Sequence, residues 1–234
     1  MNIVNYEKLC ISCCNLDCTC SYPVYNRYDE PGAGADFLPC FQRRNDSFPY
    51  VRHLAHEFRE ETPWMRMRIF WVDERCVSVS DSDSNYGTML RLLLQEVGMP
   101  DEYVYPIHGD CRSPAQEAKR YSDLVSGTVP LRRGFPTFDI VLLGAGDDGP
   151  YFFHFPRSGV SALFFHPYEK SINPYNGQPR IAMTGCLLFS ARKLIFLITG
   201  KNKTEVVYDI LKSGDTGPAA TWRIMPRMWT SLPT

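Results

Sequence analysis

Residues 138–156 read FDIVLLGAGDDGPYFFHFP. The run FDIVLL is apolar except for Asp139, a pattern typical of a short strand buried on both faces of a parallel sheet. Gly144 and Gly146 then allow a sharp turn and a close approach of the backbone to a ligand. Pro150 has the fixed φ of a first helical residue. The stretch predicts a strand, a glycine turn and a helix start, the place where open α/β sheets bind ligands. A tight turn without a ligand is the alternative that the motif alone leaves open.

Strand-like and helix-like segments alternate along the rest of the chain. Apolar runs predict strands at 65–72, 138–143, 160–165, 180–185 and 193–200, and helical periodicity predicts helices at 47–60, 85–97, 114–125 and 203–211. This alternation predicts an α/β fold: a doubly wound, mostly parallel sheet with helices on both faces, of the Rossmann-like type. We therefore expect the loops after the 65–72, 138–143 and 193–200 strands to open on one edge of the sheet.

The composition is that of an ordinary globular protein. The 234 residues suffice for one sizeable domain, and 44% apolar and 22% charged residues are common values. A formal net charge of −1 gives no overall reason to expect nucleic acid or a membrane surface as a partner. Because no apolar run reaches the length of a membrane span and the N-terminus lacks a signal-peptide pattern, we predict a cytoplasmic protein. The composition does not indicate an oligomeric state.

Five of the nine cysteines lie between Cys10 and Cys20. Thiolates at this density can bind zinc, but no second paired motif lies at zinc-ribbon spacing. Disulfides are not expected without a secretory signal. We therefore predict no metal site and interpret residues 1–44 as an atypical Cys-rich N-terminal segment, followed by the main α/β domain at 45–234.

Three segments that follow predicted strands concentrate polar and charged residues. WVDERCVSVSDSDSNYG at 71–87 carries acids, an arginine and an Asn-Tyr-Gly, and LLGAGDDGP at 142–150 adds two further acids. FLITGKNK at 196–203 places lysines around a helix N-terminus, where they and free backbone N–H groups can hold a phosphate.

In this order the three motifs resemble the 6-phosphogluconolactonase family, in the wider group that includes the glucosamine-6-phosphate isomerases. PIHGD at 106–110 and RIAMT at 180–184 fall between them in the family's order and approximate spacing. The resemblance extends over residues 45–222. It implies an enzyme that hydrolyses the lactone ring of 6-phosphogluconolactone, a small sugar phosphate, in the pentose phosphate pathway without a metal or an organic cofactor.

The resemblance also implies roles for individual residues. Lys203 matches the family's phosphate-binding lysine, and Arg180 matches the arginine of its RIT-like segment. Asp73 and Arg75 match the acid and the base of its DER motif, and Asp148 matches the aspartate before its catalytic histidine. The implied catalytic residues are Asp148, Asp73 and His154, and the implied substrate- and phosphate-binding residues are Arg75, Asn85, Gly146, Arg180 and Lys203.

Three positions depart from the family pattern. Pro150 occupies the position of the catalytic histidine and cannot act as a base, and the nearest imidazole, His154, lies one helical turn further on. The phosphate loop expected at 42–47 reads QRRNDS and has no glycine, and Phe189 stands where the family usually has asparagine.

Alternatives to lactone hydrolysis therefore stay open. A catalytically silent relative would bind a sugar phosphate or a protein partner. A glucosamine-6-phosphate isomerase or deaminase would use the same fold, although its chemistry also uses the missing histidine. For the single residues, Asp73 and Arg75 can form a structural ion pair, and Lys203 and His154 can be a solvated lysine and a packing histidine.

Overall fold

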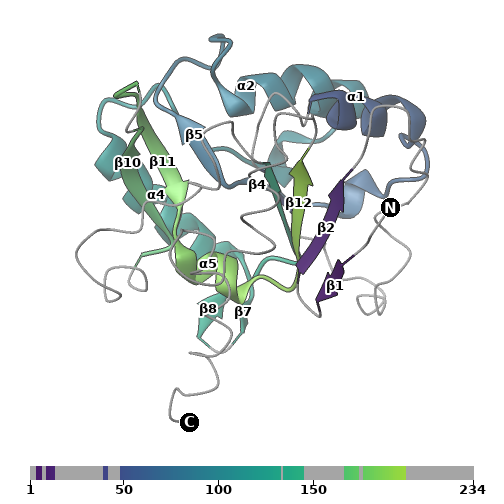
Figure 1. Ribbon diagram of the computed structural model, residues 1–234. Helices are drawn as coiled ribbons and strands as arrows, with labels where there is room; N and C mark the ends of the chain where they lie inside the picture. Colours follow the sequence, from purple (N-terminus) through teal and green to yellow (C-terminus); the bar gives the residue numbers. More distant parts are fainter. Residues whose placement is uncertain are drawn as a thin grey trace.

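The computed structural model describes residues 4–6, 9–13, 39–41, 48–132, 134–144, 166–173 and 176–198. In this part of the chain the main sheet has seven strands, in the order β1-β2-β12-β9-β3-β4-β6. Their bounds are β1 Val4–Tyr6, β2 Leu9–Cys13, β3 Pro39–Phe41, β4 Ile69–Trp71, β6 Val104–Tyr105, β9 Ile140–Gly144 and β12 Leu194–Ile198. Figure 1 labels β1, β2, β12 and β4 of this sheet.

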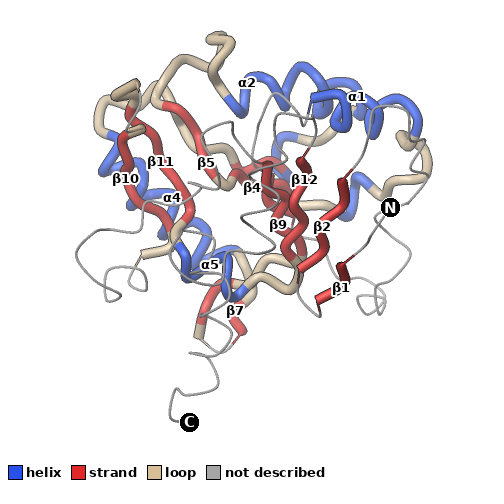
Figure 2. Tube along the Cα trace, in the orientation of Figure 1, coloured by secondary structure: helices blue, strands red, loops and turns tan. Residues whose placement is uncertain are grey.

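The chain winds outward from the middle of this sheet in both directions. It passes from β3 to β4 and β6, then returns to β9 beside β3 and continues to β12. All of these neighbours pair in parallel, as does β2 with β12, and β1 pairs with β2 in the antiparallel sense. The predicted doubly wound, mostly parallel sheet is confirmed. Figure 2 shows its strands in the middle of the molecule, with helices around them.

Strand β9 is the predicted 138–143 strand, shifted by one or two residues. The side chains of Val141 and Leu143 lie on one face of the sheet and that of Leu142 lies on the other, and all three are buried. Phe138, just before the strand, is buried as well. Because successive strand residues point to opposite faces, their burial shows that both faces of the sheet are covered at β9, which lies between β12 and β3.

The N-terminal part of the chain supplies strands to the same sheet. β2 lies at the outer side of β12, and β3 lies between β9 and β4. A strand can begin at Pro39 because the first residue of a strand tolerates a missing N–H. Residues 4–6, 9–13 and 39–41 therefore share a sheet with the later chain, while the division at residue 44 stays a prediction. Cysteines 14, 18 and 20 lie outside the described residues.

The helices broadly follow the sequence prediction. Their bounds are α1 Phe48–Glu57, α2 Asn85–Met89, a π-helical turn at Leu90–Leu94, α3 Gln95–Val97, α4 Pro114–Thr128 and α5 Gly185–Ser190. The segment predicted as one helix at 85–97 is continuous but contains the π turn, and it ends at Gly98, whose φ of +67° favours glycine. The predicted strand at 160–165 and helix at 203–211 lie outside the described residues.

A second, three-stranded sheet is not part of the parallel arrangement that the sequence predicted. It consists of β10 Tyr168–Ile172, β11 Pro179–Met183 and β5 Asp73–Arg75, all paired in the antiparallel sense. The predicted 180–185 strand is β11 and belongs here instead of the main sheet. β10 and β11 are joined by a short connection containing Gly177, whose φ is +70°. Such a connection forms a hairpin, whereas parallel neighbours need a long crossover.

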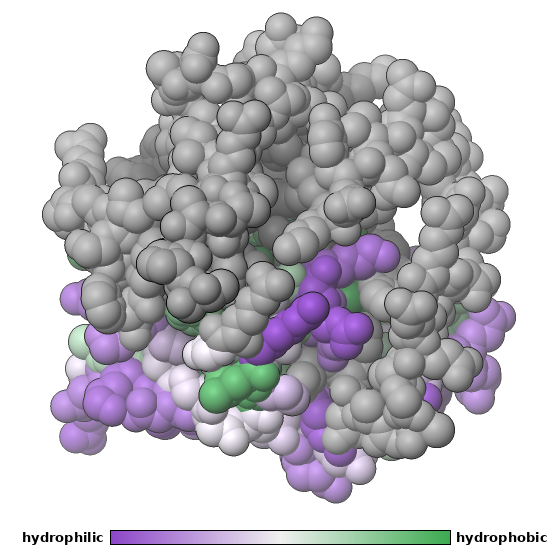
Figure 3. Space-filling model, turned by 90° about the horizontal axis from the view of Figure 1, so that it is seen from below, coloured by the Kyte–Doolittle hydropathy of each residue, from purple (hydrophilic) through white to green (hydrophobic). Residues whose placement is uncertain are grey.

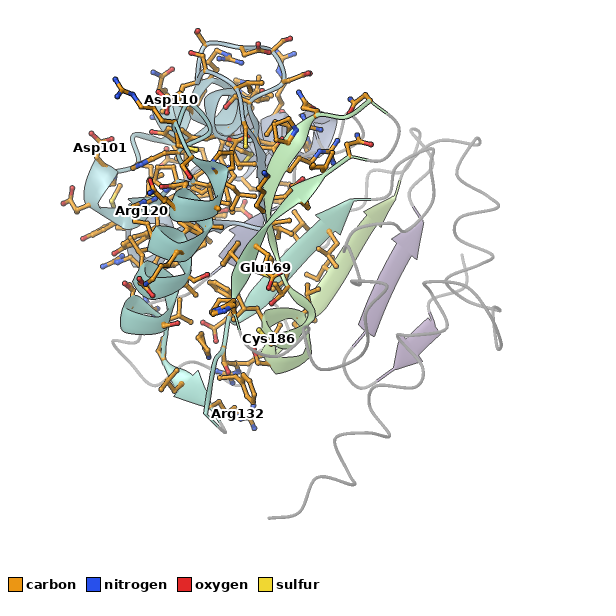
Figure 4. The ribbon with its side chains drawn as sticks, turned by 90° about the vertical axis from the view of Figure 1, so that its left-hand side faces the viewer. Asp101, Asp110, Arg120, Arg132, Glu169 and Cys186 are labelled. Atoms are coloured by element: carbon orange, nitrogen blue, oxygen red, sulfur yellow. The ribbon has the colours of Figure 1, made fainter. Side chains whose placement is uncertain are left out.

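Helix α4 packs against this second sheet. Figure 4 shows α4 from the outside, with Arg120 on the helix and Asp110 in the loop before it. Glu117 on α4 is buried and accepts two hydrogen bonds from Arg120, both 2.6 Å, and one from the N–H of His108 at 2.8 Å. The carboxylate therefore fixes the preceding loop on the first turns of the helix.

Buried tyrosine hydroxyls connect the two sheets. Tyr121 on α4 accepts from the N–H of Trp71 at 3.0 Å and donates to the carbonyl of Tyr105 at 2.7 Å. Tyr168 on β10 donates to the carbonyl of Trp71 at 2.8 Å, and the rings of Tyr121 and Tyr168 meet edge to face. Trp71 is the last residue of β4, so these contacts fix the point where the chain leaves the main sheet and enters β5.

The surface opposite α1 and α2 is mostly hydrophilic where it is described (Figure 3). Large exposed apolar side chains of the described residues are Met65, Leu131 and Ile172. Among the helices of the described ranges, none is long and apolar enough to cross a membrane.

Candidate active site

The carboxyl ends of the central strands lie at one edge of the main sheet. Phe41 at the end of β3 pairs with Trp71 of β4 and Leu142 of β9, and Gly144 of β9 pairs with Leu197 of β12. The arrowheads of β2 and β12 point towards this edge in Figure 1, on the side of α1. The segments that follow β4, β9 and β12 therefore start from a common edge, as predicted. Of these segments, the structure describes the one after β4.

Asp73 and Arg75 lie on a strand and not in a loop. The prediction treated 73–75 as the loop at the end of a strand, but these residues form β5 and pair with β11. Arg180 is directly opposite Arg75, and Asp73 is two positions before Arg75, so all three share one face of the small sheet. The reason for the difference is the neighbouring β10–β11 hairpin, because β5 forms hydrogen bonds with β11. The short charged sequence of 73–75 alone does not indicate that such a strand partner exists.

Asp73 and Arg180 come together on this face. Arg180 Nη1 lies 4.0 Å from Asp73 Oδ2, and the side chains are 21% and 8% exposed, so the pair is only partly open to solvent. Arg75 Nη1 donates to the carbonyl of Asp83 at 2.7 Å, in the loop before α2. Glu169 on β10 is opposite Ala182, which is opposite Asp73, so this face carries two guanidinium groups and two carboxylates. The two guanidinium groups lie opposite each other and are the groups on this face that suit an anionic ligand.

Asn85 orients Asp73. Its Nδ2 donates to the Asp73 carbonyl at 2.7 Å and to Asp73 Oδ1 at 3.0 Å. Asn85 is fully buried, and within the described part of the chain its Oδ1 accepts no hydrogen bond. Asn85 was predicted from the sequence as a substrate-binding residue, a role that stays a prediction. In this structure its amide is committed to the aspartate beside it.

Glu74 is the residue that the sequence prediction missed. It points to the opposite face of β5 from Asp73, is 1% exposed, and accepts four hydrogen bonds from Ser84, Asn85, Tyr86 and the N–H of Arg75. The pKa of Glu74 is raised to about 7, mainly by burial and to a smaller degree by the neighbouring Asp73 carboxylate, although the three backbone N–H groups favour the charged form. Three of its four donors are backbone N–H groups, so the sequence carries no residue pattern that points to Glu74.

The remaining predicted residues lie outside the described ranges. They are Gly146, Asp148, His154 and Lys203, together with Pro150 and the 42–47 loop. Phe189, at the position where asparagine was expected, lies in α5. Within the described ranges no three His, Cys, Asp or Glu side chains lie close enough together to hold a metal ion.

A pocket formed by described residues is lined in part by Tyr86, whose N–H donates to Glu74. Its lining comes from the 85–97 helical segment and the chain just after it: Tyr86, Leu90, Leu94, Gln95, Gly98, Met99, Asp101 and Val104. It includes no residue predicted for the site.

Comparisons with known proteins match most of the chain. The family model for glucosamine-6-phosphate isomerases/6-phosphogluconolactonase matches residues 48–228. A 6-phosphogluconolactonase of Treponema pallidum (strain Nichols) is 31% identical over 190 residues, which are 78% of this chain and 76% of that protein.

Two solved structures share the fold. The crystal structure of devB protein is 28% identical, with a TM-score of 0.71 over 81% of this chain and 80% of its own. The 6-phosphogluconolactonase of Trypanosoma brucei is 24% identical, with a TM-score of 0.68 over 79% and 78% of the two chains. At that identity the second likeness supports the fold alone.

Proposed function

Because the chain belongs to the family of glucosamine-6-phosphate isomerases and 6-phosphogluconolactonases, we propose that it is a 6-phosphogluconolactonase. The substrate is 6-phosphogluconolactone, the product is 6-phosphogluconate, and the reaction belongs to the pentose phosphate pathway in the cytoplasm. The proposed chemistry is attack of water on the lactone carbonyl, which needs a general base and a cationic anchor for the substrate phosphate.

The observation that carries the proposal is the Asp73–Arg180 pair. Its two residues are about a hundred positions apart in the sequence, yet they lie 4.0 Å apart where the chain leaves the carboxyl end of β4. Arg180 and Arg75 on one face supply positive charge for the substrate, and Asp73 holds the Arg180 guanidinium at this edge. Lys203 and Gly146 would complete the anchor, with Asp148 and His154 as candidates for the acid–base role.

A second candidate is a catalytically silent relative that keeps the sugar-phosphate site. The observation that favours it is Pro150, which stands where the family's general base is expected and has no proton-accepting side chain. The isomerase or deaminase reading is weaker, because its chemistry also uses that histidine. The two leading candidates agree on the ligand and differ in the reaction.

The anchor is tested with Arg180→Ala. Loss of a charge-assisted hydrogen bond to phosphate should weaken the binding of 6-phosphogluconate by about 1.5–3 kcal/mol, or about 10- to 150-fold. Calorimetry measures the affinity directly. The matched control is Arg192→Ala, which removes an exposed arginine paired with Asp139 at 3.1 Å and should leave the affinity unchanged. Equal affinities for the Arg180 variant and the unmodified protein would contradict the anchor.

The reaction is tested with Pro150→His. The lactonase rate is measured after subtraction of spontaneous hydrolysis. A gain of about 10²-fold or more over the unmodified protein would show that the other groups are still arranged for catalysis. No gain, with 6-phosphogluconate still bound, would identify the silent relative. High activity in the unmodified protein would instead assign the base elsewhere, and His154→Ala should then abolish it.

A further inference from the structure

One buried carboxylate connects strand β5 to helix α2. Glu74 Oε1 accepts the N–H groups of Arg75 and Asn85, both at 2.8 Å. Its Oε2 accepts the N–H of Tyr86 at 2.7 Å and the hydroxyl of Ser84 at 3.2 Å. One donor belongs to the strand and three belong to the start of the helix, so this single carboxylate makes three of the hydrogen bonds that hold the start of α2 on β5.

Capping of α2 does not by itself explain Glu74. Ser84 is already the N-cap residue, and its Oγ accepts the N–H of Gly87 at 2.9 Å. The first two N–H groups of the helix, those of Asn85 and Tyr86, do not bond to Ser84, and both donate to Glu74. The first turn of α2 is therefore not open to a substrate phosphate, and its amides serve to hold the helix on the strand.

Glu74 acts on the site through Asn85. The backbone of Asn85 is bound to Glu74, while its side chain donates to the carbonyl and the Oδ1 of Asp73. We propose that Glu74 is a positioning residue: by fixing the first turn of α2 on β5, it holds the Asn85 amide against Asp73 and sets the orientation of the Asp73 carboxylate beside Arg180. An effect of Glu74 on catalysis rests on the proposed lactonase function, whereas the hydrogen bonds from Glu74 through Asn85 to Asp73 do not depend on it.

Direct contact between Glu74 and the substrate does not fit the geometry. Alternation along β5 puts Glu74 on the face opposite to Asp73 and Arg75, and its side chain is buried. The 107–113 loop closes over that face, since a Cβ at Gly109 would lie 3.3 Å from Glu74 Cγ and 2.3 Å from the carbonyl oxygen of Arg75. Glycine at 109 lets the loop approach, and the loop keeps solvent from the carboxylate.

Several ionisable groups lie on the elements that pack against Glu74. They are Asp73 and Arg75 on β5, Cys76 just after it, Arg180 on β11, Tyr86 on α2, and His108, Asp110 and Cys111 in the loop. Any pH effect assigned to Glu74 must therefore disappear when Glu74 alone is replaced.

The first test is kinetic and uses Glu74→Gln. Glutamine has the same shape as glutamate, but its Nε2 is a donor and cannot accept the hydrogen bonds that one carboxylate oxygen accepted. The start of α2 should therefore shift relative to Asp73. We expect kcat for 6-phosphogluconolactone, corrected for spontaneous hydrolysis, to fall about 10- to 10²-fold while KM changes little. Because a protonated Glu74 accepts fewer hydrogen bonds from the start of α2, we expect kcat of the unmodified protein to rise with pH around neutrality, and this rise should be lost in the variant. Glu102→Gln, at an exposed glutamate, is the matched control and should keep both the rate and its pH profile.

The second test follows the geometry without using activity. In the unmodified protein the amide proton resonances of Asn85 and Tyr86 should titrate together near neutral pH, and the side-chain amide of Asn85 should move with them. In the Glu74→Gln variant these pH-dependent changes should vanish. Circular dichroism and a thermal melt establish that the variant is folded, and Glu74→Asp provides a second, charged variant if it is not.

The outcomes separate this inference from the proposed function. If the unmodified protein lacks lactonase activity but the Asn85 side-chain resonances depend on Glu74, the proposed reaction falls and the positioning contact stands. If Glu74→Gln is folded and keeps full kcat in an active protein, the positioning role is overturned. Asn85 resonances that do not respond to the replacement overturn it as well.

Discussion

Glu74 and Glu117 show how two buried glutamates can respond to pH in opposite ways. Around Glu74 the donors are three neutral backbone amides and a hydroxyl, and burial raises its pKa to about 7 against them. Burial also raises the pKa of Glu117, but hydrogen bonds from Arg120 and His108 outweigh it, and the net result is a lowered pKa. A guanidinium partner decides the direction, because it interacts with the carboxylate far more strongly than neutral donors do.

The pH dependence of stability follows from this difference. The pKa of Glu74 rises from 4.5 to about 7 on folding, so the folded state binds more protons in that interval, and the free energy of unfolding should fall as the pH rises through it. The full effect is roughly 3 kcal/mol. Urea unfolding at pH 5 and pH 8 should therefore show a smaller pH-dependent loss for Glu74→Gln than for the unmodified protein. An identical loss in both proteins would contradict the shift.

At the same scale, the sequence allowed a partial prediction of the site. The motifs indicate Asp73, Arg75, Asn85 and Arg180, and the structure brings all four together around β5. Glu74 was not chosen, because its partners are backbone amides of a helix start, and no residue type in the sequence marks them. The sequence of the 73–75 segment also does not predict a strand, in which side chains alternate between the two faces of a sheet.

At the scale of elements, two glycines hold the site segments together by close approach. A Cβ at Gly87 would lie 1.9 Å from the carbonyl oxygen of Val79, and the same atom at Gly109 would lie 2.3 Å from that of Arg75. Both glycines allow backbone to contact backbone around β5 and the first turn of α2. Gly127 in α4, by contrast, has open space at its Cβ position.

Alanine substitutions should separate these cases. Gly87→Ala must displace the 76–84 loop from α2, and we expect a destabilisation of at least about 1–3 kcal/mol, the scale of an overpacked core. Gly127→Ala adds a better helix former without a clash and should stabilise the protein by about 0.5–1 kcal/mol. Thermal melts of the two variants measure the expected loss of stability at Gly87 and the expected gain at Gly127. A neutral result at Gly87 would mean that the loop is not fixed against the helix.

The elements that the sequence predicted well are those with long periodic patterns. The apolar runs at β9 and β12 and the helices after 85 and 114 were found within a few residues. The strand predicted at 65–72 is shorter: β4 covers Ile69–Trp71, and residues 65 and 66 belong to a 3-10 helix at Trp64–Arg66. β10 was missed because YEKSI is short and mostly polar, and β3 was missed because Pro39 and its neighbours look like chain breakers. In both strands the tertiary partner determines the structure, and local propensity does not.

At the scale of the whole molecule, the N-terminal strands differ in how much the sheet needs them. β1 and β2 form one border of the main sheet, whereas β3 has neighbours on both sides. Deletion of residues 1–13 should therefore expose β12 as an edge and leave a folded but less stable protein. Deletion of residues 1–41 removes an interior strand and should abolish cooperative unfolding. Urea titration of the two truncated proteins, followed by far-UV circular dichroism, tests this order, and equal stability of both would contradict it.

The central position of β3 also has a consequence for synthesis of the chain. Pro39 pairs with Ile140, so the third strand in the sequence waits for a partner about 100 residues later. At the usual pace of translation that wait is roughly 5–20 s. During this time β3, β4 and β6 can assemble on the ribosome, but the edge of β3 stays open and able to pair with another chain. Newly made copies of this protein should therefore depend on chaperones that bind early in translation, in the interval before β9 emerges.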